Sequence, residues 1–238
     1  MFNREDVPMQ PEIVNYPRVD TLTLARNKVL RNTYLLLALS LVPTVVGAYI
    51  GTHMDFSFMA GHPLLFTLGM FAVVMGLGWG ISANRNSGLG VALLLAMTLF
   101  LGVMLGPILQ VALRFANGPQ LIALAAGGTS VIFFALAGLA TVTKKDFSFL
   151  GKFLFIGLIL LLVAMVANAF LHIPALALTL SVIAILIFSG YLLFDVSRVV
   201  NGGETNYVMA TLAIYLDIYN IFVNLLYLLM ALAGNNRN

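Results

Sequence analysis

The stretch that decides the fold is FLFIGLILLLVAMVANAFLHIPALALTLSVIAILIFSGYLLF, residues 153–194, which contains no Asp, Glu, Lys or Arg. A helix needs about 20 apolar residues to cross the hydrocarbon core of a bilayer. These 42 residues are therefore long enough for two crossings. His172-Ile173-Pro174 lies near their middle, and a proline there favours a turn between two helices over one very long helix. The stretch predicts a hairpin of two membrane-spanning helices.

The rest of the chain repeats this pattern. Uncharged runs occupy residues 32–54, 56–84, 86–113 and 115–143, and a last apolar segment, 204–237, is interrupted inside by Asp217. Each of these five segments is long enough for one crossing. We therefore predict an all-α membrane protein with seven transmembrane helices. Their expected ranges are 33–52, 64–83, 89–113, 120–143, 149–171, 175–199 and 208–232.

Composition points the same way. Of the 238 residues 61% are hydrophobic and 9% are charged, against a charged share of about 25% in soluble domains. This composition excludes an ordinary soluble enzyme. It predicts that the protein lies in a lipid bilayer, which is then its expected partner. The basic residues are scattered singly or in pairs, so we expect no nucleic-acid binding. Because the chain has no cysteine, disulfides and thiolate metal sites are excluded.

The first 32 residues differ from the remainder. They mix acidic and basic side chains and include Pro8 and Pro11 before any apolar run, which is unlike a secretory signal peptide. The sequence thus predicts a flexible cytosolic tail, 1–32, and a seven-helix transmembrane domain, 33–238. With the tail in the cytoplasm, ten Lys and Arg residues lie inside and only Arg114 and Arg237 outside. This bias favours a cytoplasmic N-terminus and a C-terminus on the opposite side.

Two acids inside the predicted spans need an explanation, because an ionised carboxylate in hydrocarbon is costly. Asp195 lies near the inner end of the sixth helix and Asp217 lies inside the seventh. If they touch, one proton is shared between them, and the pair is a candidate pH sensor and ion gate. A turn centred on Gly202-Gly203 would place Asp217 roughly 9 Å deeper than Asp195, whereas a longer loop would restore contact. Both geometries are open from the sequence.

Other polar residues complete the candidate site. Asn220 and Asn224 follow Asp217 at spacings that form one polar stripe on the seventh helix. The candidate counter-ions are Arg198, three residues after Asp195, and Arg85 at the inner end of the second helix. The alternative interpretation is structural: Asp195 pairs with Arg198, and Asp217 bonds a neighbouring helix.

Catalysis is not expected. Two aspartates on adjacent helices also suit an intramembrane aspartyl protease. Such proteases, however, have a Gly-x-Gly-Asp run, whereas Tyr215 and Leu216 precede Asp217 here. Phosphate-binding loops, serine-nucleophile motifs and metal-ligand clusters are missing from the sequence. No resident cofactor is predicted, and Asp195 with Asp217 is the candidate for a weak, transient calcium site, since calcium prefers oxygen ligands.

Several motifs carry a resemblance to a known family. They are GGETNY at 202–207 and YLDIYNIF at 215–222, with KVLRNTY at 28–34, GPIL at 106–109 and KDFSFLG at 145–151. Together they resemble the Bax-inhibitor superfamily, and within it the bacterial YccA branch. The resemblance implies two layers of three helices around a central C-terminal helix. It also implies the bacterial inner membrane as location, with a periplasmic C-terminus.

The resemblance implies two activities. Members of the YccA branch are associated with modulating FtsH, a membrane-anchored ATP-dependent protease, in membrane-protein quality control. FtsH and its accessory proteins are then the expected partners, and the polar tail is the expected contact. Other members of the superfamily are described as pH-sensitive calcium leak channels that are gated by two acids, whose positions Asp195 and Asp217 match. We take protease modulation as the expected function and the leak as the alternative.

Overall fold

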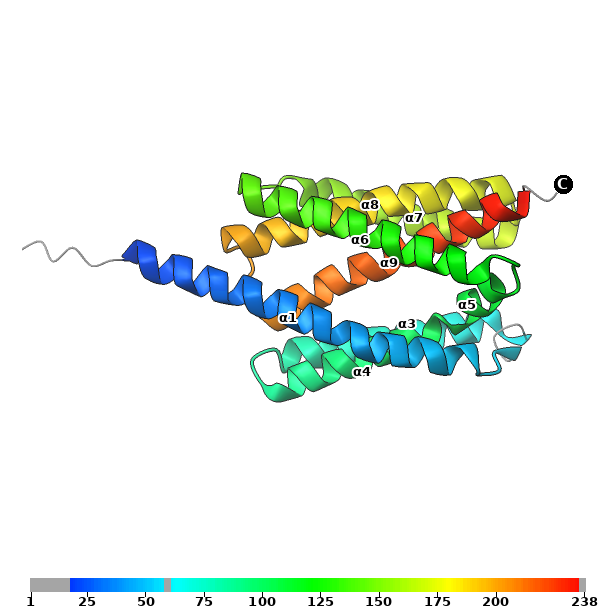
Figure 1. The fold of residues 1–238 in the computed structure, drawn as a ribbon, viewed down its shortest axis with the longest axis horizontal. Helices are drawn as coiled ribbons and strands as arrows, with labels where there is room; N and C mark the ends of the chain where they lie inside the picture. Colours follow the sequence, from blue (N-terminus) through cyan, green and yellow to red (C-terminus); the bar gives the residue numbers. More distant parts are fainter. Residues whose placement is uncertain (1–17, 58–60, 236–238) are drawn as a thin grey trace, which may run out of the picture.

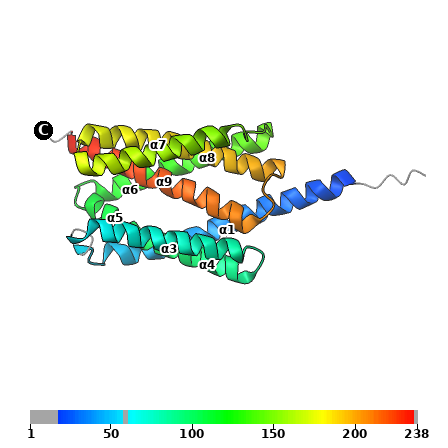
Figure 2. The ribbon, with the colours of Figure 1, turned by 180° about the vertical axis from the view of Figure 1, so that it is seen from behind.

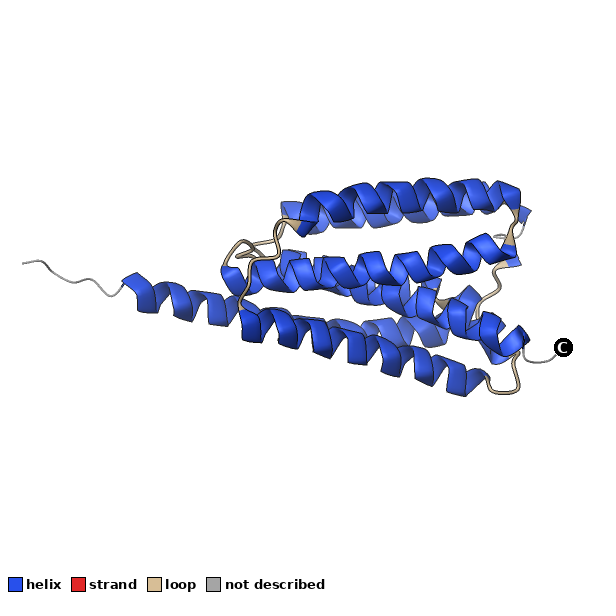
Figure 3. Ribbon diagram, turned by 90° about the horizontal axis from the view of Figure 1, so that it is seen from above, coloured by secondary structure: helices blue, strands red, loops and turns tan. Residues whose placement is uncertain are grey.

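The computed structural model describes residues 18–57 and 61–235, and every regular element in these two ranges is an α-helix (Figure 3). In the labels of Figure 1 the helices are α1 (Arg18–Thr52), α3 (Pro63–Ala83), α4 (Gly88–Met104), α5 (Gly106–Leu113), α6 (Gly118–Thr143), α7 (Leu150–Leu171), α8 (Pro174–Asn201) and α9 (Tyr207–Asn235). Seven segments are long and apolar enough to cross a membrane, with α4 and α5 together forming one of them. The seven predicted spans are confirmed.

The first helix is longer than predicted. It begins at Arg18 rather than at Thr33, so residues 18–32, expected to be part of the tail, are helical. Between Arg18 and Asn32 the chain has no glycine or proline, and Leu, Ala, Arg and Lys favour the helix. The N-terminal part of α1 extends past the ends of the other helices (Figure 1). The rest of the predicted tail, residues 1–17, lies outside the described residues.

The third span is broken near its C-terminal end. One helix was predicted over 89–113, but α4 ends at Met104 and α5 starts at Gly106. Pro107 has no N–H group and lies in the first turn of α5, where none is needed.

Glycine allows α1 to pack closely against this broken span. A Cβ atom added to Gly102 would clash with the backbone of Thr44, and one added to Gly106 would clash with the backbone of Gly51. The two helices therefore meet backbone to backbone, as small residues permit in membranes. Near the C-terminal end of α1, the Gln110 amide donates to the carbonyl oxygens of Gly51 (3.0 Å) and Met54 (2.8 Å). These bonds satisfy carbonyl groups at the C-terminal end of α1.

The last helix is the interior element. Figures 1 and 2 show α1, α3 and α4 on one side of the molecule and α6, α7 and α8 on the other, with α9 passing obliquely between them. Helix α9 contacts α1, α3, α4, α5, α6 and α8. Between residues 207 and 234 its exposed residues are Tyr227, Leu232 and Gly234. Apart from Tyr227, the polar side chains on α9 are therefore at least partly covered by protein.

Candidate functional site

The connection between α8 and α9 places the two acids. Gly202 ends α8 with a φ of 79°, and the N–H of Gly203 donates to the carbonyl of Arg198 at 2.8 Å. Asn206 caps α9, since its Oδ1 accepts hydrogen bonds from the N–H groups of Val208 and Met209 at 3.0 Å. The connection therefore runs from residue 202 to residue 206, and it is centred beyond Gly202-Gly203.

The connection brings the two acids together. The carboxyl groups of Asp195 and Asp217 lie within hydrogen-bonding reach of each other, so the structure has the contact geometry that the sequence left open. Asp217 is 5% exposed, and the side chain of Asp195 is 14% exposed. Two ionised carboxylates have no donor between them, so a hydrogen bond between these acids requires a proton on one of them.

A second observation supports that proton. Oδ2 of Asp217 is buried and has no hydrogen-bond partner among the described residues. A buried carboxylate oxygen without a donor is costly, especially within a membrane. A proton held by Asp195 and Asp217 would supply a hydrogen-bond donor between their carboxyl groups and lower this cost.

Arg198 is the basic residue beside the pair. Its guanidinium lies 3.8 Å from Oδ1 of Asp195 and 3.7 Å from Oε2 of Glu204, and it lies over the ring of Phe194 at 5.5 Å. The predicted pairing of Asp195 with Arg198 is thus present alongside the contact with Asp217. Arg198 also links Asp195 to the α8–α9 connection through Glu204.

Arg85, the second predicted counter-ion, is placed differently. It makes no ion pair with Asp195 or Asp217, all three being described residues. Its backbone carbonyl instead accepts a hydrogen bond from Nδ2 of Asn206 at 3.0 Å. The same amide donates to Oδ1 of Asn86 at 2.8 Å. Asn206 therefore fastens the α8–α9 connection to the α3–α4 turn, a role that the sequence analysis missed.

The predicted polar stripe does not act as one unit. Nδ2 of Asn220 donates to the carbonyl of Leu216, and Nδ2 of Asn224 donates to the carbonyl of Asn220, both at 2.8 Å. Both amides are therefore engaged by their own helix. Asn220 also lines a cavity of about 900 Å³ near the outer end of the bundle, together with Gln110, Asp55 and Arg114.

Three polar side chains of α9 that the sequence analysis did not single out tie it to α1 and α4. The Tyr215 hydroxyl lies 2.8 Å from Oγ1 of Thr44. Tyr219 donates to the carbonyl of Leu101 at 3.2 Å, and Thr211 donates to that of Thr33 at 3.2 Å. Their position in the sequence could have indicated these contacts. A hydroxyl group inside an apolar span needs a hydrogen-bond partner in the protein.

The acid pair alone is a sparse site for a metal ion. Calcium takes six to eight oxygen ligands, and the pair offers four oxygens at most. Within the described ranges, no group of three or more His, Cys, Asp and Glu side chains is placed to hold a metal. What the site can do chemically is hold a proton between two helices and release it.

The fold and site thus define a multi-pass helical membrane protein with a buried acid pair. Residues 26–235 match the family model described as inhibitor of apoptosis-promoting Bax1. The chain is 42% identical over 218 residues to the modulator of FtsH protease YccA of Escherichia coli K12, covering 91% of this chain and 96% of that protein. It is 39% identical over 232 residues to an uncharacterized protein of Neisseria meningitidis, covering 96% of this chain and 100% of the relative.

The chain belongs to the Bax-inhibitor family, as its motifs predicted. A relative from another Escherichia coli strain is named inner membrane protein YccA, and one from Vibrio cholerae is named uncharacterized membrane protein. Together with the seven apolar helices, these relatives establish a multi-pass protein of the inner membrane.

Asn206 generates the first testable prediction. Asn206→Ala removes the cap of α9 and both bonds to the α3–α4 turn, so we expect the free energy of unfolding to fall by about 1–3 kcal/mol. The measurement is denaturant or thermal unfolding of the purified protein in detergent. Asn86→Ala is the matched control, because it removes only one of these bonds at an exposed position. Equal losses for the two variants would contradict the assigned role of Asn206.

Proposed function

We propose that this protein modulates a membrane-anchored ATP-dependent protease of the FtsH type, without catalysis of its own, in the quality control of membrane proteins. The observation that carries the proposal is the N-terminal part of α1, which extends beyond the rest of the bundle (Figure 1). Its residues Leu24, Arg26, Asn27 and Lys28 are exposed. The name of the relative from Escherichia coli K12 supports the choice of protease.

The way α1 is held suggests how modulation works. A protease that pulls on a terminus must extract the helix that follows it. Here α1 packs backbone to backbone against α4 and α5, and Gln110 bonds its far end. Hydrogen bonds between Thr33 and Thr211 and between Thr44 and Tyr215 join its middle to α9. Extraction must break these contacts together, so the protein would occupy the protease and slow its action on other substrates.

The topology is part of this proposal. We propose that the N-terminus lies in the cytoplasm and the C-terminus in the periplasm, following the excess of Lys and Arg on the N-terminal side. We also propose that the two helix groups act as layers around α9. The partners would then be FtsH, with or without its accessory proteins, and the surrounding lipid.

Removing the N-terminal segment tests the proposal. Deletion of residues 2–25 should abolish co-purification with FtsH and the protection of its other membrane substrates, measured by their half-lives in cells. In a control, residues 2–17 are replaced by a Gly-Ser sequence of the same length, which keeps an accessible terminus and the whole of α1. We expect this control to retain both properties. A deletion variant that still co-purifies and protects would overturn the proposal.

A second candidate function rests on the hydrogen bond between Asp195 and Asp217. We propose, as the alternative, a pH-sensitive calcium or other cation leak in which this pair is the gate. The shared proton holds α8 and α9 together. Its loss leaves two carboxylates that repel each other and offer hard oxygen ligands. The cavity lined by Asn220, Gln110 and Asp55 supports an outer entrance, and Arg198 is the nearby counter-charge.

Calcium entry into dye-loaded proteoliposomes tests the alternative. We expect flux that increases from acidic to weakly alkaline pH in the wild type and that loses this dependence in the Asp195→Asn/Asp217→Asn variant. Asp146→Asn is the control, because Asp146 is an exposed carboxylate outside the pair. A flux with the same pH dependence in the wild type and the double variant would exclude the pair as a gate. No flux at any pH would exclude the leak.

A further inference from the structure

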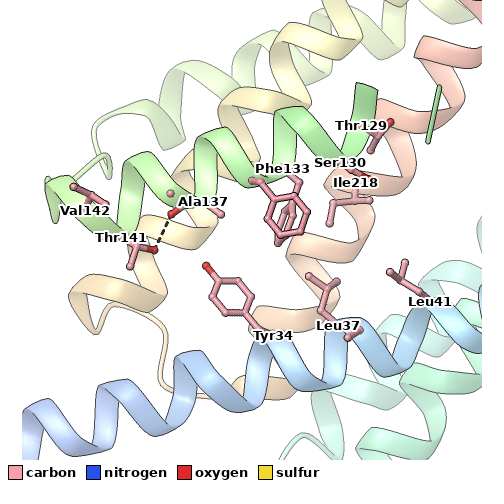
Figure 4. A pocket seen from close by; sticks show the side chains of 13 residues that line it. Tyr34, Leu37, Leu41, Thr129, Ser130, Phe133, Ala137, Thr141, Val142 and Ile218 are labelled. Carbon is pink, nitrogen blue, oxygen red and sulfur yellow. Dashed lines mark hydrogen bonds between the residues drawn. The ribbon is translucent and has the colours of Figure 1, made fainter. Parts of the chain in front are cut away.

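A lateral groove separates α1 from α6, and we call it the α1–α6 groove. It encloses about 610 Å³ and is lined by side chains of α1, α6 and α9, among them Tyr34, Leu37, Phe133, Ala137, Thr141 and Ile218 (Figure 4). The two helices meet at Tyr34, whose ring lies edge to face with that of Phe133 at 6.2 Å and whose hydroxyl faces Thr141. Ile218 contributes to the lining from the central helix, next to Asp217.

The groove lies at the level of the membrane core. Its lining residues on α1 and α6 fall within the spans Arg26–Thr52 and Gly118–Thr143, and none of them is charged. An occupant there has to be apolar, because hydrocarbon surrounds it. A membrane-spanning helix, about 10–12 Å wide and 30 Å long, fills roughly 2,000–3,000 Å³. The groove is several times smaller, so its size suits a lipid acyl chain rather than a helix.

One end of the groove is basic. Arg31 lies three residues before Tyr34 on α1, and Lys144 lies three residues after Thr141 at the end of α6. Helices α1 and α6 run in opposite directions along the groove (Figure 1). The residues before Tyr34 and the residues after Thr141 therefore lie at the same end. Arg31 and Lys144 are both exposed.

The neighbouring acid does not cancel this charge. Asp146 is exposed, and hydrogen bonds from the side chain and the backbone N–H of Ser148 hold the pKa of its carboxyl below the ordinary value. It therefore remains a single negative charge that is already engaged by Ser148. Exposed cations at one end of an apolar groove are complementary to a phosphate group that is attached to an acyl chain.

We propose that the α1–α6 groove binds one anionic phospholipid. An acyl chain lies along Phe133, Ala137 and Ile218, and the phosphate lies between the cations at the end of the groove. The lipid would fill the gap between the two helix groups and cover α9 beside Asp217. This site is independent of the leak proposal, since it does not use the acid pair. It can be tested separately from the protease proposal, because deletion of residues 2–25 leaves Arg31 and the lining of the groove in the chain.

Gly138 permits a test of the acyl-chain site. It lines the groove, and a Cβ atom added there would meet no atom within 4 Å, so Gly138→Leu fills the groove without disturbing a neighbour. Gly127, also exposed and open on α6, is not among the lining residues, so Gly127→Leu is the matched control. Native mass spectrometry of the full chain with added phosphatidylglycerol measures retention. We expect about tenfold weaker retention for Gly138→Leu, because it excludes CH₂ groups of the chain, and no change for Gly127→Leu.

A charge variant tests the headgroup. Arg31→Gln/Lys144→Gln/Lys145→Gln should remove the preference for phosphatidylglycerol over phosphatidylcholine, whereas Lys152→Gln, an exposed cation on α7, should keep it. Equal retention of both lipids by the wild type would overturn the proposal, as would equal retention of phosphatidylglycerol by the two leucine variants. A second protein chain that is held by the wild type and lost from Gly138→Leu, with lipid retention unchanged, would also overturn it.

Discussion

The membrane interior offers no water to the polar side chains of α9, so each of them has to find its partner inside the protein. Thr211 and Tyr215 find theirs on α1, Tyr219 on α4, and Asp217 on α8. These bonds connect α9 to helices on both sides of the molecule. The positions of α1, α4 and α8 follow from this requirement, since displacing any of these three helices would leave a polar group of α9 without a partner in an apolar medium.

The two proposed functions depend on this constraint in different ways. Protease modulation needs a bundle that resists extraction, and the bonds of α9 to α1 contribute to that resistance together with the glycine contacts between α1 and α4. A leak needs the bundle to open, and the bond between Asp195 and Asp217 is the one that a change of pH removes. The α1–α6 groove, which Ile218 helps to line, reaches the same helix and would give the proposed lipid access to it.

The seven spans and the motifs could be predicted because they depend on local sequence: uncharged runs of sufficient length, and short blocks of residues that resemble a known family. The start of α1 at Arg18 was missed because charge suggested a tail, although residues 18–32 contain no helix breaker. The contact of Asp195 with Asp217 depends on how the 202–206 connection is built, and the placement of Arg85 depends on Asn206 bonding a turn far away in the sequence. Periodicity on one helix carries no information about such contacts.

We infer that one proton is held between Asp195 and Asp217. Infrared spectroscopy of the protein in lipid, with the aspartates labelled by carbon-13, detects such a proton, because a protonated carboxyl group has a carbonyl stretch that a carboxylate lacks. We expect that band at neutral pH in the wild type, its loss in Asp217→Asn and its persistence in Asp146→Asn. Absence of the band from the wild type at neutral pH would show that the pair does not hold a proton.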